Sequence, residues 1–245
     1  MIDKETNINN LLNFNYQLRN IIDAKIENGV TNNNPTDLYM AYVLGKSYKT
    51  YSATIMLCEN KFGEDACMLA RTLFELMVIC KYILKDKTGE RLKRFIDFDW
   101  VTRKQMLSYF DDIQLQKLDN KTIKNIADNC DKAKKKWKYE RGVWSDKSIE
   151  KMAEDIGRLD AYKTVYKLQC NLGHSNPRSI NEYVKEECGN FIVGIEGGNN
   201  FIEESLVIIF DFMSNIAKEA YQIYDWEIGD LDKIINEYEI FVHNK

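Results

Sequence analysis

Three residues carry side chains that could perform chemistry together: Arg71, Glu75 and His174. Arg71 and Glu75 stand four residues apart, so a helix would place them on one face, where they can pair. His174 follows a helix break in a polar stretch, 172–177. Imidazole titrates near neutrality and can move a proton, while a guanidinium can hold a phosphate. The set suits metal-independent cleavage of RNA with His174 as acid and base, and it equally suits recognition of an anionic small molecule.

Each of these residues also has a structural interpretation. A partly exposed pair of Arg71 and Glu75 would contribute under about 1 kcal/mol to stability. A histidine at the end of a helix commonly caps free backbone carbonyls, so His174 could belong to a network that only stabilises a large bundle. Proximity and exposure separate these interpretations, because a shared open pocket would favour a ligand or a reaction.

Further polar and aromatic residues are candidates for ligand binding. Tyr162 and Tyr166 recur with Cys170 and His174 at every fourth position, which gives one slowly drifting helical stripe. Tyr82 falls on the stripe of Arg71 and Glu75, although tyrosines at such spacing also pack in cores. The predicted ligand-binding set is Tyr82, Tyr162, Tyr166, Asn176 and Arg178.

A basic segment, KAKKKWKYER at 132–141, interleaves cations with aromatic side chains. Such a segment can follow a phosphate backbone and stack bases. The alternative is a solvated helix end, where lysines are favoured by the helix dipole. The candidate nucleic-acid contacts are Lys134, Lys135, Lys136 and Trp137.

Several classes of function are not indicated. The chain has no P-loop, no GxGxxG after a strand, no GxSxG and no HExxH. It has two histidines, and His243 lies in a terminal tail that we expect to be disordered. We therefore expect no metal centre and no cofactor. The six cysteines form no CxxC, which favours free thiols in a reducing, cytoplasmic compartment.

The elements that must position the candidate residues are helices, because Gly and Pro are scarce and apolar residues recur at helical spacing. The central one covers 64–85 and contains the apolar run 66–84. Arg71, Glu75 and Lys81 make that run costly to insert into a bilayer, so we expect a buried helix and no membrane span. With a net charge of −4, a general nucleic-acid or membrane field is not indicated.

We expect one all-α domain, a bundle of about 8–9 helices with a small β-hairpin or flap near 188–198. The C-terminal helices within 200–242 should pack on the same core, and the apolar helices are compatible with a homodimer. The other expected helices cover about 7–28, 37–61, 90–111, 118–138, 145–156, 159–172, 201–224 and 231–242.

Several short segments between about residues 66 and 178 recur in a fairly specific order: 70–75 (ARTLFE) with 82–84, Trp144 with 148–149 and 153–157, and Tyr162 and Tyr166 with His174 to Pro177. This arrangement resembles a bacterial domain of unknown function, DUF5677. It implies a helical protein with an RxxxE-plus-His constellation and no established activity. Members usually carry a small hydroxyl residue four positions before the His, where this chain has Cys170.

A looser analogy is to HEPN-type helical ribonucleases and abortive-infection toxins of phage defence. Their mark is an Arg followed four to six residues later by His on one helix, which this chain lacks. The analogy would require a site assembled from two helices. RNA and an anionic small molecule therefore remain the two candidate partners.

Overall fold

The computed structural model describes residues 3–27, 29–139, 142–166, 177, 180–194 and 197–244. The chain divides into two compact units. The first unit is Met1–Lys81 with Ala153–Lys245, and the second unit is Tyr82–Met152. The expected all-α fold with a small hairpin is confirmed. That the chain forms one domain stays a prediction.

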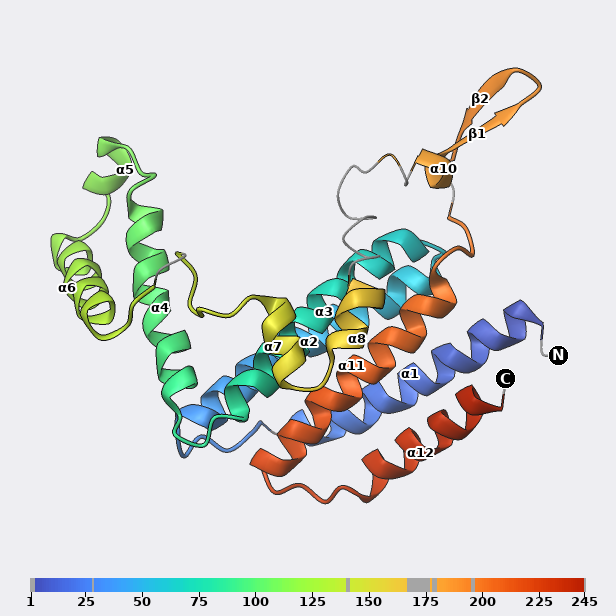
Figure 1. Ribbon diagram of the computed structural model, residues 1–245, viewed down its shortest axis with the longest axis horizontal. Coiled ribbons are helices and arrows are strands. Elements are labelled where there is room, and N and C mark those ends of the chain that lie inside the picture. Colours follow the sequence, from blue (N-terminus) through green and yellow to red (C-terminus); the bar gives the residue numbers. More distant parts are fainter. Residues whose placement is uncertain are drawn as a thin grey trace. The chain divides into compact units, whose positions relative to one another are not determined.

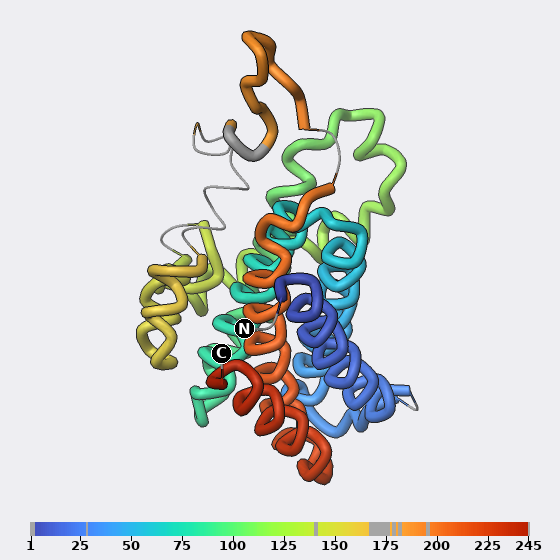
Figure 2. Tube along the Cα trace, turned by 90° about the vertical axis from the view of Figure 1, so that its right-hand side faces the viewer, coloured from blue at the N-terminus to red at the C-terminus, as the bar shows by residue number. Residues whose placement is uncertain are grey.

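The long helices of the first unit are α1 (Lys4–Ile26), α2 (Pro35–Glu59), α3 (Gly63–Leu84), α11 (Ile202–Ile223) and α12 (Gly229–His243). Polar side chains cap the N-termini of α1 and α2. Asp3 accepts a hydrogen bond from the backbone N–H of Thr6, and Asn34 caps α2 ahead of Pro35. α11 packs against α1 and α2, and α12 packs against α1 (Figures 1 and 2).

A buried polar contact fixes the register of α11 against α1. The Asn15 amide donates to the carbonyls of Leu11 and Leu206 at 2.7 and 3.2 Å. The Tyr51 hydroxyl of α2 donates to the Asn15 side-chain oxygen at 2.8 Å. Asn15 and Tyr51 are fully buried, so these bonds satisfy groups that would otherwise destabilise the core.

The C-terminal tail differs from the expectation. α12 continues to His243, whose Nδ1 lies 2.8 Å from the Glu239 carbonyl, so the expected disorder of this histidine is wrong. The end of α12 is ordered by aromatic packing on α1, where the Phe14 ring centre lies 5.5 Å from that of Tyr238 and 5.3 Å from that of Phe241. That contact orders the last helical turns.

Helix α3 is buried on most of its surface, as its composition predicts. Leu73, Met77 and Cys80 are buried on one face, and Cys67 and Val78 are buried on the other. None of the described helices combines the length and the apolar composition needed to cross a membrane.

The start of α3 is held by a close backbone crossing. A Cβ at Gly63 would overlap the carbonyl oxygen of Asn200, so only glycine fits there. Gly198 donates its backbone N–H to the Lys61 carbonyl at 2.8 Å, and Phe62 forms a bridge with Gly198. The segment leading into α11 is thereby fixed to the first turn of α3.

The second unit contains α4 (Glu90–Leu107), α5 (Asp112–Gln116) and α6 (Asn120–Lys136), with α4 packed on α6 (Figure 1). The helix expected over 90–111 ends earlier, because Asp111 begins α5 through a capping box with Gln114. Leu92, Ile126 and Ala133 are buried in this unit.

Shorter elements follow: α7 (Ile149–Asp155), α8 (Leu159–Ala161), a π-helix η1 (Tyr162–Tyr166) and α10 (Ile180–Tyr183). The helix expected over 159–172 is therefore α8 continued by a π-helix, and its remaining residues lie outside the described ones. Strands β1 (Val184–Glu187) and β2 (Asn190–Val193) pair antiparallel. Their two-residue turn has positive φ at Cys188 and Gly189, as is typical of hairpin turns. The hairpin begins at Val184, slightly before the expected 188–198.

Candidate functional site

Helix α3 positions the first two candidate residues. The Arg71 Nε donates to Glu75 Oε1 at 3.2 Å, so the predicted pair one turn apart is confirmed. The two side chains are 29% and 35% exposed, whereas the helix around them is largely buried. The pair therefore lies within reach of solvent in a mainly apolar stretch of α3, whose Lys81 forms a separate ion pair with Glu219 at 3.0 Å.

Tyr166 joins this pair from 91 residues further along the chain. Its hydroxyl donates to Glu75 Oε1 at 2.8 Å and accepts from Arg71 Nη2 at 3.2 Å. The guanidinium carbon of Arg71 lies 5.0 Å from the centre of the Tyr166 ring, within cation–π range. We call these three residues the Arg71 cluster. Its members come from two segments far apart in the sequence, α3 and the π-helix η1.

Aromatic packing fixes the Tyr166 ring. It meets the buried Phe74 ring at 5.4 Å on one side, and it stacks on Tyr162 at 5.0 Å with 20° between the ring planes. Tyr162 and Tyr166 are the first and last residues of the π-helix η1. Such π-turns are rare and occur frequently at functional sites.

The pKa of Tyr166 is raised to about 12, chiefly by burial and next by its hydrogen bond to Glu75. The hydroxyl therefore stays protonated at neutral pH. It is suited to donating a hydrogen bond and holding Glu75 in place, and it is unsuited to accepting a proton in a reaction. Any acid–base role in this region falls to another group.

Three candidate residues, His174, Asn176 and Arg178, lie outside the described residues. Their predicted roles, an acid–base for His174 and ligand contacts for Asn176 and Arg178, stay predictions. Across the described part of the chain, no group of three or more His, Cys, Asp or Glu side chains is arranged to hold a metal ion.

The remaining candidates belong to the second unit. Tyr82 is buried beneath the Arg91 guanidinium, which lies 3.8 Å from its ring centre. Lys134, Lys135 and Lys136 are exposed in the last turn of α6. Trp137 is half-buried, and its indole N–H donates to Asp97 at 2.6 Å. The predicted contact role of these four residues stays a prediction.

Sequence reasoning missed two arrangements. One is an ion pair in the first unit, between Arg158 and Asp211 at 2.9 Å. The other is a pocket in the second unit whose arginines, Arg91 and Arg94, stand three residues apart on α4. The spacing of the two arginines just after the Gly89 break is a weak signal, because Trp137 and Trp144 lie far from them in the sequence and join them only in the folded unit.

A family model described as a family of unknown function (DUF5677) matches residues 37–191, more than half of the chain. The matched range includes the whole Arg71 cluster and the pocket of the second unit. Comparison with curated proteins and with solved structures gave no match.

Proposed function

The chain belongs to the DUF5677 family, and we propose that it recognises a phosphate-bearing ligand through the Arg71 cluster. The observation that carries this proposal is the guanidinium of Arg71. The Arg71 side chain is 29% exposed, yet its guanidinium is held at Nε by Glu75 and at Nη2 by Tyr166. An arginine oriented in this way can meet an anion with little further loss of side-chain freedom.

The hydrogen-bond directions support exchange with a ligand. The Tyr166 hydroxyl donates its hydrogen bond to Glu75 and stays protonated. Arg71 Nη2 therefore donates to a neutral hydroxyl oxygen. A phosphate oxygen is a stronger acceptor for a guanidinium. Phosphate would therefore replace Tyr166 at Nη2, while Tyr166 keeps Glu75 in place.

Thermal unfolding of the full chain with adenosine 5′-monophosphate or inorganic phosphate tests the proposal. A ligand at 100 times its Kd stabilises the native state by about 2.7 kcal/mol, which raises Tm by several degrees. We expect this shift in the wild type and its loss in Arg71→Gln.

The matched control is Arg158→Gln. Arg158 is 31% exposed and also forms an ion pair, so the control removes the same charge from the same unit. Its ligand-induced shift should equal that of the wild type. Loss of the shift in both variants, or no shift in the wild type with either probe, would contradict the proposal.

Metal-independent RNA cleavage is a second candidate, with Arg71 binding the scissile phosphate and His174 transferring the proton. It is favoured by the contact of Tyr166 with α3, because Tyr166 precedes His174 by eight residues on the same predicted stripe. Glu75 would orient Arg71. This candidate needs the two-segment site that an analogy to HEPN-type ribonucleases requires.

Induced expression followed by growth and total RNA integrity tests cleavage. We expect growth arrest and degraded RNA in the wild type, and neither in His174→Ala or Arg71→Ala. The control is His243→Ala, which removes the exposed histidine at the end of α12 and should remain toxic. Intact RNA with the wild type would leave ligand recognition as the function.

A further inference from the structure

The second unit has a charge opposite to that of the whole chain. Residues 82–152 contain 18 Lys and Arg against 12 Asp and Glu, a net charge of +6, whereas the full sequence has −4. The first unit, with 16 against 26, therefore has −10. Such an asymmetry indicates a polyanionic partner for the basic part.

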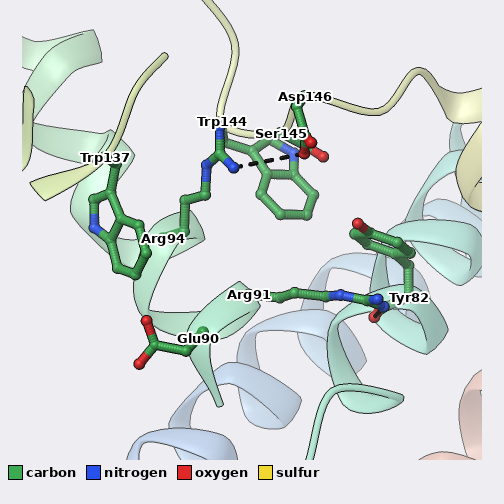
Figure 3. A pocket seen from close by; sticks show the side chains of 8 residues that line it. All are labelled: Tyr82, Glu90, Arg91, Arg94, Trp137, Trp144, Ser145 and Asp146. Carbon is green, nitrogen blue, oxygen red and sulfur yellow. Dashed lines mark hydrogen bonds and ion pairs between the residues drawn. The ribbon is translucent and has the colours of Figure 1, made fainter. Parts of the chain in front are cut away.

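Within this basic unit lies an open pocket of about 230 Å³, which we call the tryptophan pocket (Figure 3). Three of its eight lining residues are aromatic, Tyr82, Trp137 and Trp144, and the other five are polar or charged. Trp144 meets Phe95 edge-on at 5.3 Å and Tyr82 at 6.1 Å, so its ring is held from two sides. The volume is below the ~300–1,000 Å³ usual for a complete small-molecule site, so the pocket suits one ring system of a larger partner.

Two arginines line the pocket together with two carboxylates, Asp146 and Glu90, and Glu90 is paired with Lys93 at 3.2 Å. In Figure 3, Arg94 points to Asp146 and Arg91 points to Tyr82. The Arg91 Nη1 donates to the Tyr82 carbonyl at 2.6 Å, and its planar group stacks on the Tyr82 ring. A guanidinium held flat on an aromatic ring is a stacking surface with a positive charge.

Arg94 is incompletely neutralised. Its Nη1 lies 3.5 Å from Asp146 Oδ1, a long ion pair whose aspartate is 66% exposed. Its Nε is buried and has no hydrogen-bond partner among the described residues. The Asp146 carboxylate thus stands where a phosphate oxygen could bind, and an anion brought by a ligand would compete with it.

The lysine-rich end of α6 is joined to this pocket by direct contacts. Lys136 Nζ lies 4.4 Å from the centre of the Trp137 ring, and Arg94 Nη2 donates to the Lys138 carbonyl at 2.9 Å. Lys134 and Lys135 are exposed on the same helical turn. Exposed lysines therefore adjoin the pocket, and Lys136 itself is paired with Asp97 at 3.2 Å.

We infer that the tryptophan pocket holds one unpaired base of a single-stranded nucleic acid, whose phosphates run along the lysines at the end of α6. Aromatic and guanidinium planes stack bases of any sequence, and exposed lysines bind the backbone. The inference is independent of the Arg71 cluster, since every residue that carries it belongs to the second unit.

Fluorescence anisotropy of the full chain with labelled 12-nucleotide oligouridylate and oligothymidylate at about 50 mM salt tests this inference. We expect saturable binding of the single strands and much weaker binding of a duplex of equal length. The DNA probe is unaffected by any ribonuclease activity, so it separates this inference from the RNA-cleavage candidate. No binding of either single strand, or equal binding of the duplex, would overturn it.

Trp137→Ala should weaken binding by about 5- to 150-fold, the loss expected for one stacked base. The matched control is Trp100→Ala, on α4 and not among the residues lining the pocket, which should bind as the wild type. Equal losses in the two variants would overturn the inference.

Asp146→Asn provides a test in which the expected result is tighter binding of the oligonucleotide. Asp146 is 66% exposed, so the variant should fold, and removing its carboxylate from Arg94 should tighten binding by about 1.5- to 5-fold. Unchanged or weaker binding would show that Arg94 does not meet the phosphate.

The plot of log K against log salt has a negative slope, to which each phosphate contact of a single strand contributes about 0.7. The double variant Lys134→Gln/Lys135→Gln should therefore make that slope shallower by about 1.4. Lys121→Gln/Lys124→Gln removes the same charge from the first half of α6 and should leave the slope unchanged. Equal changes in the two variants, or competition by polyglutamate as strong as by the oligonucleotide, would reduce the interaction to general charge attraction and overturn the base-binding role.

Discussion

Tyr166 has two hydrogen-bonding roles at the scale of a single residue. Its one hydroxyl donates to Glu75 and accepts from Arg71, so it converts a pair on one helix into a contact between distant segments. The Tyr166 ring also packs against Phe74 of α3 and against Tyr162 of its own segment. Removing the hydroxyl while keeping the ring separates these contributions.

Tyr166→Phe should lower the free energy of unfolding by about 1–2 kcal/mol, because two hydrogen bonds to charged groups are lost at a partly exposed site. Urea denaturation measures this loss. The control is Tyr109→Phe: Tyr109 is 73% exposed and bonded only to Gln105 among the described contacts, so its loss should be close to zero. A Tyr166→Phe protein as stable as the wild type would show that the bonds to Arg71 and Glu75 contribute nothing net.

Alkaline pH should weaken the native state through Tyr166. Its folded pKa is raised from 10 to about 12, so the folded state holds the proton more tightly than the unfolded state. The resulting stabilisation is complete below pH 10 and is lost as the pH rises through 12. Urea unfolding at increasing pH should therefore show a steeper loss in the wild type than in Tyr166→Phe. Parallel curves for the two proteins would contradict this assignment.

At the scale of an element, the position of α3 depends on Gly63, which has no side chain. The carbonyl of Asn200 occupies the space that a Cβ at Gly63 would need. The crossing also includes the backbone bond from Gly198 to Lys61. α3 and the segment before α11 are therefore positioned by backbone atoms, which cannot move aside as a long side chain can.

Gly63→Ala should destabilise the protein by about 1–3 kcal/mol or more, the usual range for overpacking. Gly45→Ala is the matched control, since Gly45 lies within α2 with nothing near its missing Cβ. That change should stabilise the protein by about 0.5–1 kcal/mol. Thermal unfolding of the two variants should move in opposite directions, and equal shifts would contradict the crossing.

The helices and their buried faces could be predicted from sequence, because apolar periodicity reports on packing directly. The Arg71–Glu75 pair followed from the four-residue spacing on α3. The π-helix could not be predicted, since one wider turn leaves no distinct pattern in the residues 162–166. The tryptophan pocket was missed because Tyr82, Arg94 and Trp144 are brought together only by folding of the second unit.

At the scale of the whole molecule, the first unit is closed by its C-terminal helices. α12 buries Leu231, Ile234, Ile235 and Tyr238, and the Tyr238 ring stacks on Phe210 at 3.8 Å. α11 carries the central buried residues against α1 and α2. The two ends of the sequence therefore form one core.

Deleting residues 229–245 should unfold or nearly unfold the first unit. Burial of a large apolar side chain contributes about 1.5–3 kcal/mol, so four of them approach the total stability of a typical domain, about 5–15 kcal/mol. Thermal unfolding and dye binding to exposed apolar surface would measure the effect. Removing only residues 244–245 is the control, and a full deletion that melts at the wild-type temperature would contradict the assignment of α12 to the core.

The bond from Asn15 to Leu206 spans 191 residues, and this separation has a consequence for synthesis on the ribosome. At about 5–20 residues per second, the N-terminal helices wait roughly 10–40 s for α11 to be made. The second unit is complete 50 residues before α11 begins and can fold from local contacts. The nascent chain therefore passes through a stage in which α4 and α6 can pair while the apolar faces of α1 and α2 lack α11, and apolar surface exposed in this way favours aggregation.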